Sequence, residues 1–133
     1  MFQTIQSLVS AYERRSVEDC MACMATGPRV MAYGTNEDEK RMGAEAVRQQ
    51  FLADWAQTSA ASMAVTWRHE VQHGDIGWIA ADLRLRFATP HGVEESAGRA
   101  TFVMVRVPQG PWLIEHMHFS APATLAAGQS LVD

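Results

Sequence analysis

Residues 112–122 read WLIEHMHFSAP, and this stretch decides the fold because its pattern is that of a strand in a partly buried sheet. Side chains alternate between the two faces of a strand, so the stretch divides into two sets, each mixing apolar bulk with titratable groups. One set is Trp112, Ile114, His116 and His118, and the other is Leu113, Glu115, Met117 and Phe119. Charged groups are seldom buried without partners, so we expect the strand to line a pocket or a subunit interface. The sequence does not distinguish which face of the strand lines a pocket and which forms an interface.

Extended segments fill the second half of the chain. They span about residues 63–73, 77–87, 94–107 and 112–119, with the turn sequences HGD, TPHG and PQGP between them. Short loops between consecutive strands predict an antiparallel meander. In the segment 77–87, apolar residues at alternate positions form one face, and Asp82, Arg84 and Arg86 lie on the other.

The first half of the chain predicts helices. Apolar residues recur at the helical period in residues 2–14, 17–24 and 43–55, with a short strand at 30–33 and a polar turn at 34–41. Helices on one side of a curved antiparallel sheet make an α+β fold, cone-shaped, with a cavity between sheet and helices. We predict a single domain over residues 1–133, with its core at about 2–122 and a C-terminal tail at 123–133.

Composition excludes several classes of protein. The chain of 133 residues is 47% hydrophobic and 20% charged, with a formal charge of −4, which is ordinary for one globular domain. This charge gives no electrostatic footprint for nucleic acid or an anionic membrane. The N-terminus lacks the pattern of a signal peptide, and no apolar run reaches the roughly 20 residues that span a bilayer. We therefore expect a cytoplasmic protein without nucleic-acid or membrane partners.

Cys20 and Cys23 form a CxxC motif, which is found in redox and zinc sites. Here Val17, Cys20 and Met24 share one helical stripe, and neither a second CxxC nor a strand leading into the helix is present. We interpret Cys20 as a core residue and Cys23 as its neighbour at the edge of the core.

The segments RATFVMVR (99–106) and PQGPWLIEHMHFSAP (108–122) resemble the SnoaL-like branch of the nuclear transport factor 2 superfamily. They are most similar to the group related to the association domain of calcium/calmodulin-dependent kinase II, whose last strand reads WxxxHxHxSxxP. Here Pro122 comes one place early. The resemblance covers about residues 2–122 and implies a cone-shaped α+β domain that pairs through its sheet into homodimers. Such domains include isomerases, cyclases, dehydratases and non-catalytic binding modules, so the fold alone does not decide the function.

The resemblance implies a ligand site in the cone. It places Arg84 in the cavity, where a guanidinium can bind a carboxylate, although an ion pair with a nearby acid is the structural alternative. Two positions that hold arginine in the association domain are Phe102 and Phe119 here, which leaves Arg99 as the remaining arginine. The full set of expected ligand-binding residues is Arg84, Arg99, Trp78, Tyr33, Trp55, Met117 and Phe119.

A catalytic function would need an acid or base in an apolar cavity. The candidates are His116, His118, Asp82 and Glu115, while Asp54, near the end of a helix, is expected to face solvent. The two histidines also fit a metal pair or plain packing, but no third ligand with matching spacing is present, so we expect no metal. No glycine-rich phosphate loop is present either, and we expect no cofactor.

Two functions from different classes remain. The first is a homo-oligomerising domain that binds a small organic or carboxylate ligand. The second is a cofactor-independent isomerase, cyclase or dehydratase-type enzyme.

Overall fold

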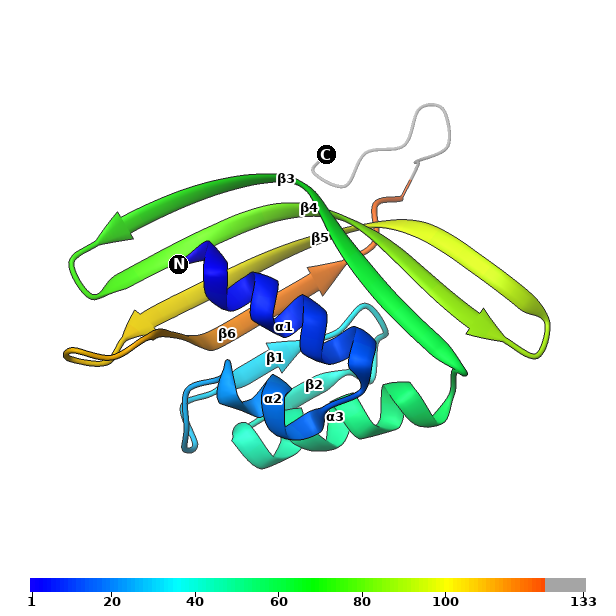
Figure 1. The fold of residues 1–133 in the computed structure, drawn as a ribbon, viewed down its shortest axis with the longest axis horizontal. Helices are drawn as coiled ribbons and strands as arrows, with labels where there is room; N and C mark the ends of the chain where they lie inside the picture. The colour runs from blue at the N-terminus through cyan, green and yellow to red at the C-terminus, as the bar shows by residue number, and fades with distance from the viewer. Residues whose placement is uncertain (124–133) are drawn as a thin grey trace, which may run out of the picture.

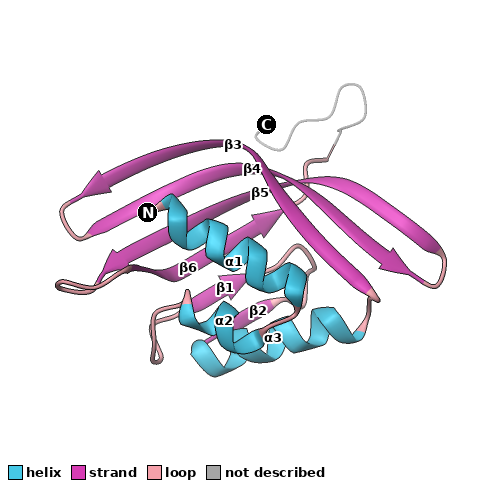
Figure 2. Cartoon of the chain, in the orientation of Figure 1, coloured by secondary structure: helices cyan, strands magenta, loops and turns pink. Residues whose placement is uncertain are grey.

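The computed structural model describes residues 1–123, and the expected tail lies from residue 124 onward outside the described residues. It has the predicted α+β architecture, with N-terminal helices against one curved sheet (Figures 1 and 2). The elements are α1 (Phe2–Arg14), α2 (Val17–Ala22), β1 (Met31–Tyr33), β2 (Lys40–Met42), α3 (Ala44–Ala56), β3 (Ala60–His73), β4 (Ile76–Thr89), β5 (Gly92–Arg106) and β6 (Trp112–Ser120). Within residues 1–123, no helix is long and apolar enough to cross a membrane.

The first two helices meet at a sharp corner. In α1, the buried residues Ile5, Leu8 and Tyr12 lie on one stripe, as their spacing predicts. The helix ends at Arg15, which adopts a left-handed conformation with φ of 60°. Ser16 then caps α2, because its hydroxyl accepts a hydrogen bond from the Asp19 amide at 3.3 Å. This corner brings the end of α1 toward the C-terminal end of α3.

The sheet has the strand order β2-β1-β6-β5-β4-β3. The four long strands form the predicted antiparallel meander, but β1 pairs with β6 in parallel. The prediction that residues 34–41 form only a turn is wrong at its end, because Lys40 and Arg41 belong to β2, which pairs with β1. A strand of three residues is too short to give an alternation signal. The pairing of β1 with β6 joins distant segments and leaves no local trace in the sequence.

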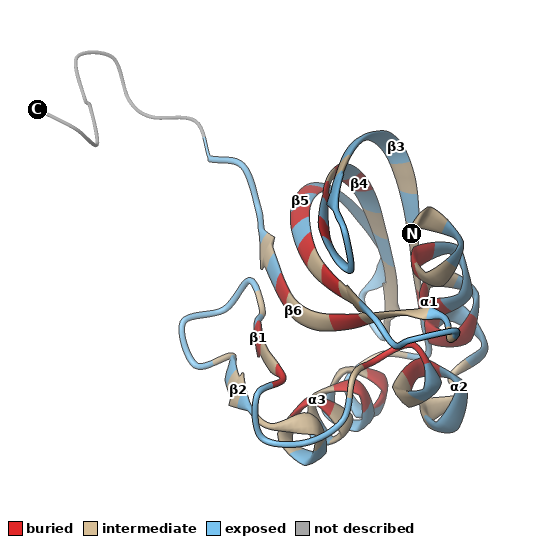
Figure 3. Ribbon diagram, turned by 90° about the vertical axis from the view of Figure 1, so that its left-hand side faces the viewer, coloured by how far each residue is buried: buried red, intermediate tan, exposed pale blue. Residues whose placement is uncertain are grey.

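The sheet has an inner face toward the helices and an outer face away from them. In β4, the buried residues Ile79, Ala81 and Leu83 define the inner face, and they alternate with Asp82 and Arg84 on the outer face. Figure 3 shows the buried residues gathered where the helices meet the sheet. The largest fully buried side chains include Phe102, Ile5, Leu8 and Met24. The core therefore occupies the space between the inner face and the helices.

A β-bulge in β6 changes the predicted division of its side chains. Met104 pairs with Ile114 and Val103 pairs with His116, so Glu115 is an extra residue without a partner on β5. Ile114 and Met117 are consequently both buried, at 0% and 4% exposed. The prediction that they lie on opposite faces is wrong, because one inserted residue shifts the alternation by one step.

Candidate functional site

A pocket of about 580 Å³ lies between α1, α3 and the inner face of the sheet. Its apolar wall consists of side chains from α1, α3 and the strands β3, β4 and β6: Leu8, Val47, Phe51, Met63, Leu85, Phe87, Met117 and Phe119. The polar side is formed by α3 and by the loop that joins β1 to β2. A mostly apolar pocket with a few polar groups, of this size, is typical of sites for small organic molecules.

Asp54 is the central polar group of this pocket. Its Oδ1 accepts a hydrogen bond from Gln50 Nε2 at 2.6 Å, and its Oδ2 lies 3.4 Å from the Tyr12 hydroxyl. The same Gln50 Nε2 donates to Glu39 Oε2 at 2.7 Å. One amide thus bridges two carboxylates at the pocket wall. The expectation that Asp54 faces solvent is wrong, because Asp54 lies on the side of α3 that faces α1.

The pKa values of Asp54 and Tyr12 are both raised. Burial is the largest cause for the Asp54 carboxyl, and the nearby Glu39 carboxylate raises its pKa further, against the opposing hydrogen bond from Gln50. Burial also raises the pKa of Tyr12, and the negative charge of Asp54 adds to this effect. Asp54 is therefore easier to protonate than an ordinary aspartate, and Tyr12 keeps its proton.

Arg15 fixes the end of α3 that carries Asp54. Its guanidinium donates to the carbonyl oxygens of Trp55 and Thr58, both at 2.7 Å, and to the Thr58 hydroxyl at 3.0 Å. These groups lie at the C-terminal end of α3, where carbonyls lack partners within the helix and a positive charge is favourable. The corner between α1 and α2 thereby holds one wall of the pocket in place.

The predicted ligand-binding residues divide between the two faces of the sheet. Met117 and Phe119 line the pocket, and Tyr33 borders it. Tyr33 alternates with the buried Ala32, so its ring lies on the outer face beside His118. Trp55 does not line the pocket. Its ring is stacked on that of the pocket residue Phe51, with the two centroids 6.0 Å apart. Its indole nitrogen is buried without a hydrogen-bond partner among residues 1–123.

Arg84, Arg99 and Trp78 lie on the outer face. Arg84 is exposed and alternates with Leu83 and Leu85, of which Leu85 lines the pocket. The expectation that Arg84 points into the cavity is therefore wrong in its placement: the apolar set of β4 faces inward and the charged set faces water. Arg99 pairs across the strands with Asp82, which is also exposed on the outer face.

The remaining catalytic candidates also lie away from the pocket. The rings of His116 and His118 lie near Tyr33, with the His118 and Tyr33 centroids 5.0 Å apart. His116 Nδ1 lies 3.0 Å from the Met31 carbonyl oxygen. Glu115 forms a surface ion pair with Arg29 at 3.2 Å. Among the described residues, no three histidine, cysteine or acidic side chains converge as a metal site would require.

Tyr12 and Gln50 were not predicted as site residues. A signal for the polar side of the pocket exists in α3, because Asp54 follows Val47 and Phe51 at seven and three residues and therefore shares their buried stripe. A carboxylate on an otherwise apolar stripe indicates a buried acid. Glu39 and Arg41 could not be found in this way, since neither the loop before β2 nor the three-residue strand β2 has a periodic pattern.

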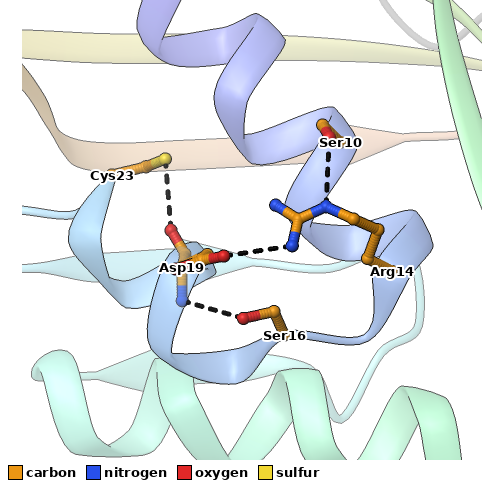
Figure 4. A network of polar contacts seen from close by, with 5 residues as sticks. All are labelled: Ser10, Arg14, Ser16, Asp19 and Cys23. Carbon is orange, nitrogen blue, oxygen red and sulfur yellow. Dashed lines mark hydrogen bonds and ion pairs between the residues drawn. The ribbon is translucent and has the colours of Figure 1, made fainter.

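A second groove of about 550 Å³ runs along the exposed side of α1. Here Arg14 forms an ion pair with Asp19 at 3.1 Å, and the Cys23 thiol donates to the Asp19 carbonyl (Figure 4). Cys20 and Cys23 are both buried, so the prediction for Cys20 is confirmed and Cys23 is more buried than expected. Burial raises the pKa of Cys20 to about 12 and also raises that of Cys23, so both thiols are unreactive at neutral pH.

The fold and the pocket define the class of protein. A nuclear transport factor 2-like superfamily protein from Salmonella enterica subsp. enterica serovar Typhimurium str. LT2 matches with a TM-score of 0.84 and 14% identity, over 96% of this chain and 92% of that one. A protein from Streptomyces avermitilis, provisionally named a dehydratase of the same family, matches with a TM-score of 0.83 and 17% identity, over 92% and 94%.

A third solved structure comes from the association-domain group. A protein from Thiobacillus denitrificans, provisionally named a calcium/calmodulin-dependent protein kinase type II association domain, matches with a TM-score of 0.77 and 22% identity, over 90% and 93% of the two chains. A comparison with curated protein sequences gives no significant match. The family model for the SnoaL-like domain matches residues 2–124, and the chain belongs to this family.

Proposed function

We propose that this chain binds a small, mainly apolar organic molecule in the pocket between α1, α3 and the inner face. The observation that carries the proposal is the pocket itself: about 580 Å³, apolar on the sheet side and polar on the α3 side. Such an arrangement buries the body of a ligand and orients it through one end. A carboxylate ligand held by Arg84 has less support, because Arg84 lies on the opposite face from Leu85.

Binding can be tested with 2-phenylethanol, which is small, neutral and mostly apolar. In a backbone amide NMR titration, we expect shifts at Met63, Leu85 and Phe119. The variant Leu85→Trp fills the pocket and should weaken binding at least tenfold, whereas Arg84→Ala, one residue away on the outer face, should leave it unchanged. Shifts confined to the outer face, or equal binding by both variants, would refute the proposal.

We also propose that two chains pair through the outer face of the sheet. This face carries large apolar side chains that are at least one-third exposed: Tyr33 at 36%, Met42 at 63%, Trp67 at 55%, Ile76 at 59% and Trp78 at 38%. Monomeric proteins rarely expose an apolar area of this kind, and tryptophan and tyrosine are enriched in interfaces. The likeness to the Thiobacillus denitrificans structure that is provisionally named an association domain also supports a homodimer.

Light scattering coupled to size exclusion tests this pairing. We expect twice the 14.7 kDa of one chain at micromolar concentration. Trp67→Glu puts a charge into the interface and should give the single-chain mass. Leu52→Glu is the matched control, because Leu52 is a 36% exposed apolar residue on α3, away from the sheet's outer face. A single-chain mass for the unmodified protein would refute the dimer.

A second function, acid–base catalysis in the same pocket, has one specific observation in its favour. Asp54 is a partly buried carboxyl with a raised pKa, and it lies beside the protonated hydroxyl of Tyr12. This pairing of a proton acceptor with a hydrogen-bond donor suits the removal of a proton next to a carbonyl group. The dehydratase and isomerase activities of the superfamily would use such a step.

Hydrogen–deuterium exchange at the methylene group of phenylacetone, followed by proton NMR in D₂O, tests for this chemistry. A catalytic Asp54 predicts exchange at least tenfold faster with the unmodified protein than with Asp54→Asn. His118→Gln serves as control, since His118 lies on the outer face and should not matter. Equal exchange by the unmodified protein and Asp54→Asn would exclude this second function for this ketone class.

A further inference from the structure

The polar side of the pocket has more hydrogen-bond acceptors than donors. Gln50 Nε2 donates hydrogen bonds to Asp54 at 2.6 Å and to Glu39 at 2.7 Å, so both hydrogens of the Gln50 amide group are occupied. Asp54 Oδ2 has only the 3.4 Å contact with the Tyr12 hydroxyl. Gln50 Oε1 is buried and has no donor among residues 1–123. This corner therefore offers acceptors and lacks hydrogen-bond donors to match them.

The residues that line the pocket also carry more negative than positive charges. Four carboxylates line it, from Asp38, Glu39, Asp54 and Glu94, against the single guanidinium of Arg41. Arg41 Nη1 donates to the carbonyl oxygens of Asp38 and Lys40, at 2.9 and 3.2 Å, so this nitrogen binds the neighbouring backbone. Within the described part of the chain, no lysine or arginine forms an ion pair with Asp54 or Glu39.

The rest of the pocket determines the shape of a matching ligand. Leu85, Phe87, Met117 and Phe119 form an apolar wall that comes from β4 and β6. A partly buried carboxylate without a cationic partner is costly, and the raised pKa of Asp54 reflects this cost. A positive charge brought by a ligand would offset it, whereas a ligand carboxylate would add repulsion.

We propose that the pocket selects a ligand with a protonated amine on an apolar body, the ammonium placed at Asp54 and Glu39 and the body against the apolar wall. This inference rests on the proposed ligand-binding function and specifies its ligand class. An ammonium group has only donors, so it supplies what the acceptor-rich corner lacks. Charge-assisted hydrogen bonds of this kind are about twice as strong as neutral ones.

Three probes of similar size and different charge test the inference: 2-phenylethylamine, 2-phenylethanol and phenylacetate, titrated by NMR or calorimetry at pH 7. We expect the amine to bind at least tenfold tighter than the alcohol, and the alcohol tighter than phenylacetate. Asp54→Asn should weaken binding of the amine at least tenfold, whereas the affinity for the alcohol should change less than threefold. Glu39→Gln gives a second variant with the same expected direction.

The matched control is Glu95→Gln. Glu95 follows the pocket residue Glu94 but forms an ion pair with Arg86 on the outer face, at 3.7 Å. The affinity of this variant for the amine should therefore equal that of the unmodified protein. If none of the probes binds, the proposed ligand-binding function itself fails. If phenylacetate or the alcohol binds as tightly as the amine, the pocket function stands and the inference about charge is overturned.

Discussion

Replacing Arg15 by alanine should destabilise the protein more than any other exchange of a partly exposed charge in the described residues. Arg15 donates three hydrogen bonds of 2.7, 2.7 and 3.0 Å to the end of α3. A hydrogen bond to a charged group contributes about 1.5–3 kcal/mol when buried, and partial exposure reduces this to roughly 1 kcal/mol for each bond. We therefore expect a loss of about 2–3 kcal/mol.

This loss of stability can be converted into a decrease in melting temperature. Unfolding entropy of about 2.1 cal/mol/K per residue makes 1 kcal/mol equal to roughly 3.5 °C for a chain of this size. Arg15→Ala should lower Tm by about 7–11 °C, as measured by circular dichroism and checked by urea unfolding. Alanine keeps the left-handed backbone cost at this position, so the change reports the side chain.

Two neighbouring variants complete the experiment. Arg14→Ala removes an ion pair whose partners, Arg14 and Asp19, are 54% and 57% exposed, and it should cost less than about 1 kcal/mol. Arg15→Lys keeps the charge at the helix end but loses the planar fork, so its Tm should fall between those of the unmodified protein and Arg15→Ala. Equal Tm values for Arg14→Ala and Arg15→Ala would refute the account of how α3 is held.

Three further predictions concern buried groups. Because the pKa of Asp54 is raised, its ionised form costs stability, so Asp54→Asn should raise Tm at pH 7.5. The gain should shrink as the pH falls through the raised pKa of Asp54 and vanish below about pH 4, where aspartate is protonated in both the folded and the unfolded state. Cys20 and Cys23 should resist alkylation by iodoacetamide at pH 8 in the folded protein and react within minutes in guanidinium; rapid reaction of the folded protein would contradict their burial. Ile114→Ala should cost about 2–5 kcal/mol in urea unfolding and Glu115→Ala less than about 1, because the bulge buries only the first, and similar costs would argue against the bulge.

Much of the fold could be predicted from periodicity. The helical stripe of Ile5, Leu8 and Tyr12 gave α1 with the bounds that the structure has, and alternation gave the four long strands. These patterns are local, and each follows from burying one face of an element. The strand β2 could not be predicted because its three residues are too few for a periodic signal. The parallel pairing of β1 with β6 could not be predicted because it joins distant segments.

The site was harder to predict than the fold. Alternation correctly separated Arg84 from Leu85, but only the packing of the helices decides which set faces the pocket. In β6 the bulge at Glu115 leaves no sequence signal, so the faces of His116 and Met117 relative to Ile114 could not be derived. Asp54 could have been found, because a carboxylate on the buried stripe of α3 breaks the pattern around it.

A crystal structure of the protein soaked with 2-phenylethylamine would show whether the ligand site lies on the inner face of the sheet. We expect density for the phenyl ring beside Leu85 and Phe119, with the amine nitrogen within hydrogen-bonding distance of the Asp54 carboxylate. Density beside Arg84 on the outer face, with the inner pocket empty, would mean that the ligand site is not on the inner face.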